Sequence, residues 1–396
     1  MQRGVELESR NYAALVVHES NILNEAARRV RQGEPTVAKA AAALKAEAER
    51  VLGLGPFTIT EKTQTPPSGD KRDYMSLGPY WWPNPATPDG LPYVRRDGEE
   101  NPACADFDRP TLESMTHAVE TLALGWFLFG EAAYAERAAR LLRVFFLEPA
   151  LRMNPNLNFG QAIPGKCDGR GIGIIETTLF ASTLVDAILL LRGSPALPES
   201  EFRGLQYWFA QYLAWLLESP HGRKEREEAN NHGSAFDFQI VVFARFTGQD
   251  DLAREVLAEV PARRFATQIE PDGRQPHELG RTRAMDYATM NLKLFFGLAS
   301  AAIKLDMDLW RFETSDGRGV RRALDWLVPF WTGAQPWPYK QITPFAPEGA
   351  WRLLRQAARV YSEPAYLVAA NRLPLPPDRV RSFRGNLYDP PPMGSA

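Results

Sequence analysis

A succession of helical hairpins that begins near residue 110, with no fixed repeat length, most constrains how this chain folds. The first hairpin pairs "PTLESMTHAVETLALGWFLFG" with "EAAYAERAARLLRVFFLEP", and Pro110 and Gly130 stand where a helix begins and ends, as helix-capping preferences require. Strand-like alternation does not compete with the helical period. We predict further hairpins at 174–192 with 199–218, 234–247 with 250–260 and 284–305 with 320–332, a last helix near 347–361, and an N-terminal helical pair at 5–32 and 36–52.

The irregular spacing of the hairpins selects among all-α architectures. A tetratricopeptide array would repeat its signature about every 34 residues, and no such period is visible here. With 396 residues, of which 44% are hydrophobic, the chain can bury a large core. The sequence therefore predicts one all-α domain over residues 1–371, an incomplete (α/α) toroid, followed by a Pro-rich C-terminal tail at 372–396.

An irregular stretch, residues 53–109, precedes the hairpins and is rich in Pro, Gly and large aromatic residues. Segments of this length are functional lids or disordered, and the aromatic content favours an ordered lid. The lid residues that could stack on pyranose rings are Tyr74, Tyr80, Trp81 and Trp82, and those that could pair with uronate groups are Lys71, Arg72, Arg95 and Arg96. We expect one of the two tryptophans to anchor the lid to the toroid instead.

Charge and cysteine content exclude several classes of partner. Lys plus Arg is 46 against 48 for Asp plus Glu, so there is no basic field to attract nucleic acid. No window approaches 18 apolar residues, and no membrane span or signal peptide is expected. The chain is either cytoplasmic or has lost a signal, which would make it periplasmic or secreted. Cys104 and Cys167 match no metal-ligand spacing and are two isolated thiols or one disulfide; the oligomeric state is left open.

Two clusters combine the groups needed for β-elimination at a uronic acid. "NNHG" places Asn231 and His232 at the start of an apolar helix, where a carboxylate is favoured. "HELGRTRAMDY" places Arg281 and Tyr287 six residues apart. The amide, imidazole and guanidinium could neutralise the carboxylate, while Tyr287 takes the C5 proton and returns one to O4. We expect nearby positive charge to lower the pKa of Tyr287 towards that of a usable base.

Other polar residues near these clusters could contact the sugar chain. The Gly-rich "GQAIPGKCDGRGIG" offers Gln161, Lys166 and Arg170, and the second cluster adds His277 and Arg283. Each has a structural alternative: the Gly-rich segment could be a turn, Asn231 a helix cap, His277 and Glu278 a solvated pair, and the arginines partners of nearby carboxylates. The sequence shows no cluster of acidic or histidine residues with convincing metal spacing, so no cofactor is expected.

Three motifs together carry a family resemblance: "YMSLGPYWWPNP" with "GLPYVRRDGEENP", "NNHG", and "ELGRTRAMDY". On these, over roughly residues 55–350, the chain resembles the alginate lyase superfamily of (α/α)-toroid polysaccharide lyases, and it is most similar to polysaccharide lyase families five and thirty-eight. The resemblance implies that Asn231 and Arg281 neutralise the carboxylate, that His232 assists as neutraliser or second base, and that Tyr287 is catalytic acid and base.

The sequence thus predicts a polysaccharide lyase that cleaves a 1,4-linked polyuronate, favouring mannuronate-rich alginate, by metal-independent β-elimination that leaves a 4,5-unsaturated uronate. Glucuronan is the alternative substrate. A non-catalytic polyuronate-binding protein is a second alternative. An (α/α) glycoside hydrolase would need two carboxylates flanking the bond, and Asp237, Glu278 and Asp286 form no clear pair. In guluronate, where the C5 proton and O4 lie on opposite faces, His232 would have to act as a neutral base beside Arg281.

Overall fold

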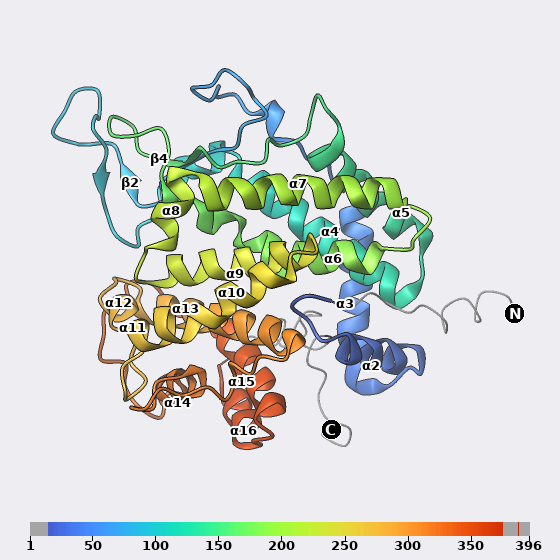
Figure 1. The fold of residues 1–396 in the computed structure, drawn as a ribbon, viewed down its shortest axis with the longest axis vertical. Coiled ribbons are helices and arrows are strands. Elements are labelled where there is room, and N and C mark those ends of the chain that lie inside the picture. Colours follow the sequence, from blue (N-terminus) through green and yellow to red (C-terminus); the bar gives the residue numbers. More distant parts are fainter. Residues whose placement is uncertain (1–14, 375–386, 388–396) are drawn as a thin grey trace, which may run out of the picture.

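The computed structural model describes residues 15–374 and Leu387. Helices follow one another around the molecule (Figure 1) and confirm the predicted all-α toroid. The helices are α2 (Ser20–Arg31), α3 (Pro35–Leu52), α4 (Arg109–Phe129), α5 (Ala132–Leu142), α6 (Val185–Leu191), α7 (Glu199–Glu218), α8 (Pro220–Arg226), α9 (Asn231–Phe246), α10 (Asp250–Val260), α11 (Ala266–Gln268), α12 (Pro276–Leu279), α13 (Ala284–Ala302), α14 (Val320–Trp331), α15 (Glu348–Val360) and α16 (Ala365–Asn371).

All the predicted hairpins are present, with differences at their ends. Gly130 ends α4 in the left-handed conformation, and its N–H donates to the carbonyl of Trp126, as expected for a helix C-terminus. The short helices α8, α12 and α16 were not predicted. The start of the predicted helix at 5–32 lies outside the described residues, and so does the predicted tail, apart from residues 372–374 and Leu387.

Residues Gly171–Leu191 correct one expectation, because this helical stretch is long and apolar enough to cross a membrane, with a mean hydropathy of 1.8. It consists of a 3₁₀ turn at Gly171–Thr177, a π-turn at Phe180–Leu184 and α6. Within the fold, 72% of its apolar window is buried. The apolar composition of this stretch is therefore explained by its burial in the core of the fold.

Helices α9 and α13 form the centre of the core and carry both predicted clusters. Nearly every side chain of the two helices is buried, and they pack against each other. A helix that is apolar on all sides must be covered on all sides, whereas α10 buries one face only. The first turns of α9 and α13 therefore lie in the interior of the toroid, which brings His232 and Tyr287 to the same region.

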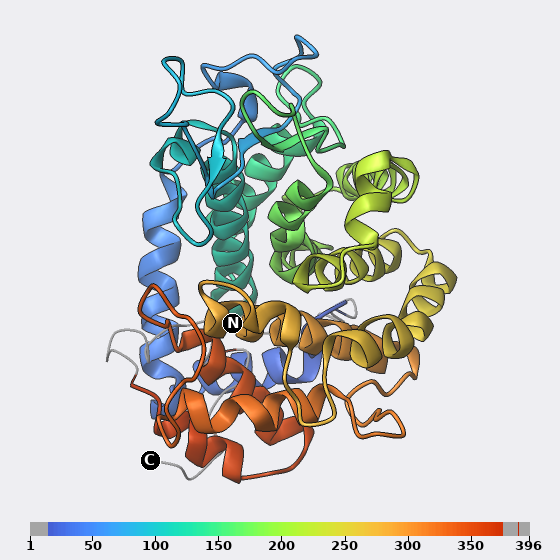
Figure 2. The ribbon, with the colours of Figure 1, turned by 90° about the vertical axis from the view of Figure 1, so that its left-hand side faces the viewer.

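The ends of the helical arc meet at the N-terminal segment. Asp186 of α6 accepts the backbone N–H groups of Val16 and His18, both at 2.7 Å. Glu19, just before α2, forms an ion pair with Arg359 of α15 at 2.8 Å. Figure 2 shows α2 (dark blue) beside the C-terminal helices (red). The N-terminal segment thus links α6, midway along the chain, with α15 near its end.

The lid is ordered and carries short strands. Strand β1 (Met75–Leu77) pairs in parallel with β4 (Phe159–Ala162), and β2 (Trp81–Trp82) pairs antiparallel with β3 (Val94–Arg95). Figure 2 shows the lid (blue to cyan) and the loop that carries β4 (green) at the same end of the helices. The lid and the Gly-rich segment therefore form one structural unit.

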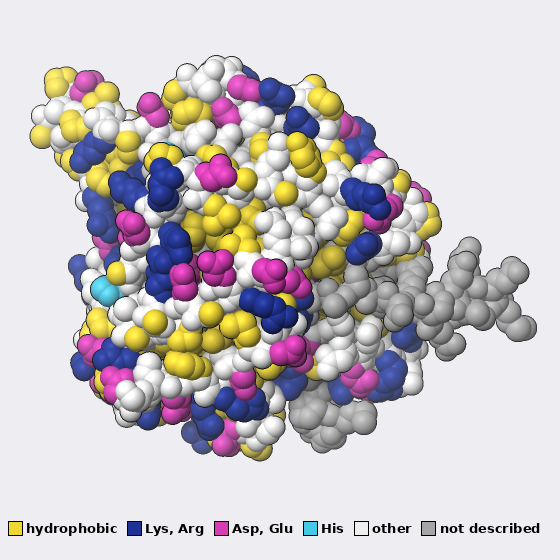
Figure 3. Space-filling view, in the orientation of Figure 1, with side chains coloured by type: hydrophobic (Ala, Val, Ile, Leu, Met, Phe, Trp, Pro, Cys, Tyr) yellow, Lys and Arg dark blue, Asp and Glu magenta, His cyan; other side chains and the backbone are white. Residues whose placement is uncertain are grey.

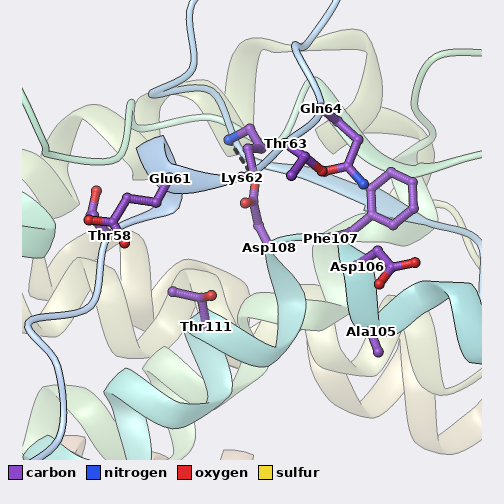
Figure 4. Close-up of a pocket in the computed structure, with 10 residues that line it drawn as sticks. All are labelled: Thr58, Glu61, Lys62, Thr63, Gln64, Ala105, Asp106, Phe107, Asp108 and Thr111. Atoms are coloured by element: carbon purple, nitrogen blue, oxygen red, sulfur yellow. Dashed lines mark ion pairs between the residues drawn. The ribbon is translucent and has the colours of Figure 1, made fainter.

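Lys62 ties the base of this unit to α4. Its ammonium forms a buried ion pair with Asp108 at 2.8 Å (Figure 4) and donates to the carbonyls of Ile59, Lys71 and Asp73. The surrounding polar cavity has a volume of about 460 Å³. Burial lowers the pKa of Lys62 and raises that of Asp108 to about 6.

Candidate active site

The turn between α8 and α9 places the first cluster. Asn230 caps α9, because its side chain accepts the backbone N–H of His232 at 3.0 Å. The residue that caps α9 is therefore Asn230. The alternative interpretation of the sequence, in which Asn231 is only a helix cap, is wrong. Asn231 and His232 occupy the first turn of α9, near the positive end of a 16-residue helix that favours a bound anion.

Asn231 is fully buried against Glu278 of α12. Its backbone N–H donates to one carboxylate oxygen and its side-chain Nδ2 to the other, both at 2.7 Å. Burial raises the pKa of Glu278, although the bonds from Asn231 oppose this. Glu278 is therefore not the solvated loop residue considered above but a buried partner of the site. The sequence feature that could have pointed to a role for Glu278 is its position three residues before Arg281.

His232 forms an ion pair with Glu225 of α8, with 2.9 Å between Nδ1 and the carboxylate. Burial alone would lower the pKa of His232, but the charge and hydrogen bond of Glu225 outweigh it, so the pKa is raised. The neutral imidazole that guluronate cleavage would require is therefore disfavoured beside this carboxylate. In its protonated form His232 could neutralise a substrate carboxylate.

Three side chains from the lid and the second cluster meet at Tyr287. Arg281 Nη2 donates to the Tyr287 hydroxyl at 2.8 Å, and that hydroxyl donates to the Tyr80 hydroxyl at 2.6 Å. The guanidinium carbon of Arg281 lies 3.8 Å from the centre of the Tyr287 ring. Burial, followed by the neighbouring Tyr80, raises the pKa of Tyr287 even though Arg281 lowers it. The expected lowering is therefore corrected, and Tyr287 rests as a neutral phenol.

Asp97 of the lid joins this group and was not singled out from the sequence. Its carboxylate lies 2.8 Å from Arg281 Nη2 and accepts the Thr282 hydroxyl at 2.9 Å. Burial acts to raise the pKa of Asp97, but hydrogen bonds from Arg281 and Thr282 hold it below its usual value. The Asp97 carboxylate thus already accepts hydrogen bonds from the Arg281 guanidinium, which we expect to bind the carboxylate of the substrate.

A cleft of about 960 Å³ unites these groups and continues into the toroid between α4, α13 and α15. Its volume lies in the range of binding sites for small molecules and short chains. The sequence-predicted residues that line it are Asn231, His232, Arg281, Tyr287, Tyr80, Trp81, Gln161 and Arg170, together with Arg95. Both predicted clusters, the lid and the Gly-rich segment therefore contribute to one cavity.

Trp81 is the lid aromatic best placed for a sugar ring. It lines the cleft, and the Lys166 ammonium lies 4.6 Å from its ring centre. Arg170 is held beside it by donating to the side-chain oxygen of Gln161 at 2.8 Å. Trp82 is instead the anchoring tryptophan, since its indole N–H donates to the Glu99 carbonyl at 2.9 Å and it is not among the described residues that line the cleft.

Besides Trp82, Lys166 and Arg96, five further predicted binding residues are not among the described residues that line the cleft. Tyr74 is fully buried, and its hydroxyl donates to Glu176 at 2.9 Å, so its ring cannot stack on a sugar. The other four are engaged or exposed elsewhere: Lys71 donates to the Lys62 carbonyl, Arg72 pairs with Asp70, Arg283 pairs with Asp286 and Glu100, and His277 is exposed on α12. Proximity in sequence to the motifs did not bring these side chains into the cavity.

Two further features concern the acidic, histidine and cysteine side chains of the described residues. Within them, no group of three or more His, Cys, Asp or Glu side chains could hold a metal ion. Cys104 and Cys167 are both free thiols, so they do not form the disulfide that the sequence left open. Arg281 is one of several cations that line the cleft, with Arg95, Arg109 and Arg170 among the others, and the raised pKa of His232 favours its positive form.

The surface around the cleft carries further positive charge. Figure 3 shows Lys and Arg side chains (dark blue) gathered over α8 and beside the lid. The last turn of α8 contributes Arg223, Lys224 and Arg226. Such a gathering of one charge on a nearly neutral protein favours approach of an acidic polymer.

Comparison with known proteins agrees with this geometry. A family model described as Alginate lyase matches residues 58–337. A crystal structure of an alginate lyase from Bacteroides ovatus is 37% identical to this chain, with a TM-score of 0.90, and the match covers 95% of this chain and 99% of that chain. Alginate lyase A1-III, as a histidine-to-alanine variant complexed with tetrasaccharide, shares the fold at 14% identity and a TM-score of 0.55, covering 89% of this chain and 95% of that one. Comparison with curated proteins gave no match.

Proposed function

This chain belongs to the alginate lyase family and is a polysaccharide lyase, and from that premise we propose that it cleaves mannuronate-rich alginate by metal-independent β-elimination. The observation that carries the proposal is the hydrogen-bonded series Arg281, Tyr287 and Tyr80 in the wall of the cleft that also contains His232, whose pKa is raised by its pair with Glu225. This arrangement supports removal of a proton beside a neutralised carboxylate.

In the proposed reaction, His232 and Arg281 bind the carboxylate of the uronate on which the C5 proton is removed. Asn231 contributes the remaining hydrogen of its amide nitrogen. Neutralisation makes C5 more acidic, because the resulting enolate-like intermediate places charge on the carboxylate oxygens. Because its raised pKa keeps Tyr287 neutral at rest, it must first lose its hydroxyl proton to solvent; the phenolate beside Arg281 then takes the C5 proton, the C4–O4 bond breaks as the C4=C5 bond forms, and the Tyr287 hydroxyl returns the proton to O4.

The pKa shifts of Tyr287 and His232 support mannuronate over guluronate as the substrate residue. In mannuronate the C5 proton and O4 lie on one side of the ring, so a single tyrosine can serve both atoms. Guluronate needs a base on the opposite face, and the neutral imidazole that could fill that role is disfavoured by the ion pair of His232 with Glu225. Polymannuronate should therefore be cleaved faster than polyguluronate. Glucuronan shares the required geometry and is the second candidate substrate.

The hydrolase alternative has less support. Asp237 is paired with Arg264, Glu278 with Asn231, and Asp286 with Arg283. None of the three carboxylates is among the described residues that line the cleft, so they do not flank a bound glycosidic bond as hydrolysis requires.

The test is to incubate the protein with alginate, polymannuronate, polyguluronate and glucuronan and to measure two products together, the ultraviolet absorbance of the conjugated C4=C5 bond and new reducing ends. A lyase generates both in equal number. New reducing ends without the double bond would establish hydrolysis, and binding with neither product would establish a binding protein. Activity should survive exhaustive chelation, and complete loss with EDTA that calcium restores would refute the metal-independent mechanism.

A further inference from the structure

Two buried side chains that do not line the described cleft hold the turn on which His232 stands. They are Arg264, in a π-turn at Pro261–Phe265 that follows α10, and Gln268, at the end of α11. Pro261 begins this π-turn and cannot donate a backbone hydrogen bond. Widened turns of this kind often occur near functional sites. Arg264 and Gln268 are four residues apart and so share one helical face.

Arg264 contacts three points of the turn. Its Nη2 donates to the Arg226 carbonyl at the end of α8 at 2.9 Å, and its Nη1 donates to the Glu228 carbonyl at 3.0 Å. Its Nε donates to the Asp237 carboxylate of α9 at 2.6 Å. A rigid, planar guanidinium that binds three acceptors fixes their relative positions, which an ammonium on a flexible stem cannot do.

Gln268 holds the same turn from its other side. Its Nε2 donates to the Asn230 carbonyl at 3.2 Å, and its Oε1 accepts the Ser234 hydroxyl at 2.9 Å. Gly233 permits the close packing, because an added Cβ would lie 2.1 Å from the Glu228 carbonyl oxygen and 2.3 Å from Arg264 Nη1. The turn and its two supports therefore fit together with no space for a side chain at position 233.

We propose that Arg264 and Gln268 are positioning residues that clamp α8 against α9 and thereby set the separation of Glu225 from His232. The inference rests on the proposed function, since it assigns a catalytic purpose to the Glu225 and His232 pair. Glu225 lies on α8, one residue before Arg226 and three before Glu228, whose carbonyls Arg264 binds, and His232 lies on α9 between the cap Asn230 and Ser234. A shift of α8 along α9 would change the contact of the pair directly.

The charged groups that face His232 determine the readout. These are Glu225 at 2.9 Å, with Glu228 and Glu278 as further carboxylates, and all three raise the pKa of His232 against the effect of burial. Loosening the clamp lets Glu225 move away while the imidazole stays buried. The titration midpoint of His232 should then fall, a change that a general loss of stability would not produce.

The test is Arg264→Lys, which keeps a cation beside Asp237 but loses the planar fork. We expect kcat on polymannuronate to fall about 10- to 100-fold, as for other small displacements of catalytic groups, with KM little changed. NMR of histidine-labelled protein should show the His232 midpoint shifted to lower pH. The matched control is Arg143→Lys, because Arg143 also lies in a π-turn, at Arg143–Leu147, and holds a neighbouring helix through two bonds of its guanidinium to Glu201, both at 2.8 Å, without lining the described cleft; it should change neither quantity.

Gln268→Met provides a second variant if Arg264→Lys fails to fold, because it keeps the side-chain volume and removes the links to Asn230 and Ser234. It should lower the His232 midpoint by less than Arg264→Lys does. A folded variant of either kind with wild-type kcat and an unchanged His232 titration would overturn the clamp. The NMR titration needs no turnover, so a shifted midpoint in a protein that forms no double bond from any polyuronate would refute the proposed function and leave the clamp standing.

Discussion

The two sides of the cleft are built in opposite ways. On the toroid side, the proposed catalytic groups His232 and Asn231 are held by the buried carboxylates of Glu225 and Glu278. On the lid side, Asp97 contacts Arg281 through side chains that are partly exposed to solvent. Buried pairs hold charge in place before the substrate arrives, whereas partly exposed pairs are weak and exchangeable. The toroid should therefore determine kcat, and the lid should determine substrate affinity.

The largest effect is expected at the point where the two sides meet. Tyr287→Phe removes the one hydroxyl that exchanges protons with C5 and O4, so kcat should fall about 10²- to 10⁴-fold, the usual contribution of general acid and base catalysis. The ring and its contact with Arg281 remain, so the thermal unfolding temperature and oligosaccharide affinity should stay close to those of the wild type. Tyr207→Phe is the matched control, because that tyrosine is 65% exposed. Near-normal turnover by Tyr287→Phe would remove this residue from the mechanism.

Glu225→Gln tests the toroid side. Without the carboxylate, burial dominates and the pKa of His232 falls. In the wild type, the neutralising cation is present below that raised pKa and is lost as pH rises through it, so kcat/KM should decline on the alkaline side. The variant should lose this activity at lower pH and show kcat reduced roughly 10-fold or more near neutral pH. A pH profile of kcat/KM for both proteins checks the prediction, and identical alkaline limbs would mean that Glu225 does not control His232.

Trp81→Ala tests the lid side at its sugar platform. Loss of the ring removes stacking and the contact with Lys166, worth about 1 kcal/mol beyond buried area. We expect KM for polymannuronate to rise roughly 5- to 10-fold with kcat nearly unchanged. Trp82→Ala should act instead through lid stability, because Trp82 anchors the lid and does not line the described cleft. A drop in kcat with unchanged KM in Trp81→Ala would contradict the division between lid and toroid.

Asp97→Asn should have the smallest effect. The amide has a single acceptor oxygen, so it can keep the bond from Arg281 or those from Thr282 but not both, and the ion pair is lost; a partly exposed pair contributes about 0 to 1 kcal/mol. We expect a change of no more than roughly fivefold in KM, smaller still at high ionic strength. Steady-state kinetics at two salt concentrations measure it. A kcat loss as large as that of Glu225→Gln would show that the lid, too, determines the chemistry.

Local patterns predicted the fold because helix ends depend on nearby residues. Pro110 and Gly130 bound α4 through their own backbone preferences. The short α8 was missed because "PHGRKER" has no apolar face that would indicate a helix. Its absence from the sequence-based prediction concealed Glu225, which reaches His232 only when α8 folds back against α9.

The site was harder to predict where partners are distant in sequence. Asp97 and Arg281 are 184 residues apart, and the pairing requires the lid to fold over the toroid. Tyr74 and Trp81 lie in the same aromatic stretch, yet the first is buried on Glu176 and the second lines the cleft. Residue type cannot separate these cases, because both rings are amphipathic. The clusters around His232 and Tyr287 were predictable because each begins a helix.

The most direct test of the account compares initial rates on polymannuronate and polyguluronate of matched chain length, followed by the ultraviolet absorbance of the C4=C5 bond. With the protonated form of His232 favoured by its pair with Glu225, and Tyr287 proposed to serve both C5 and O4, cleavage of polymannuronate should be faster. Faster cleavage of polyguluronate would contradict the single-tyrosine mechanism and would require His232 to act as a neutral base.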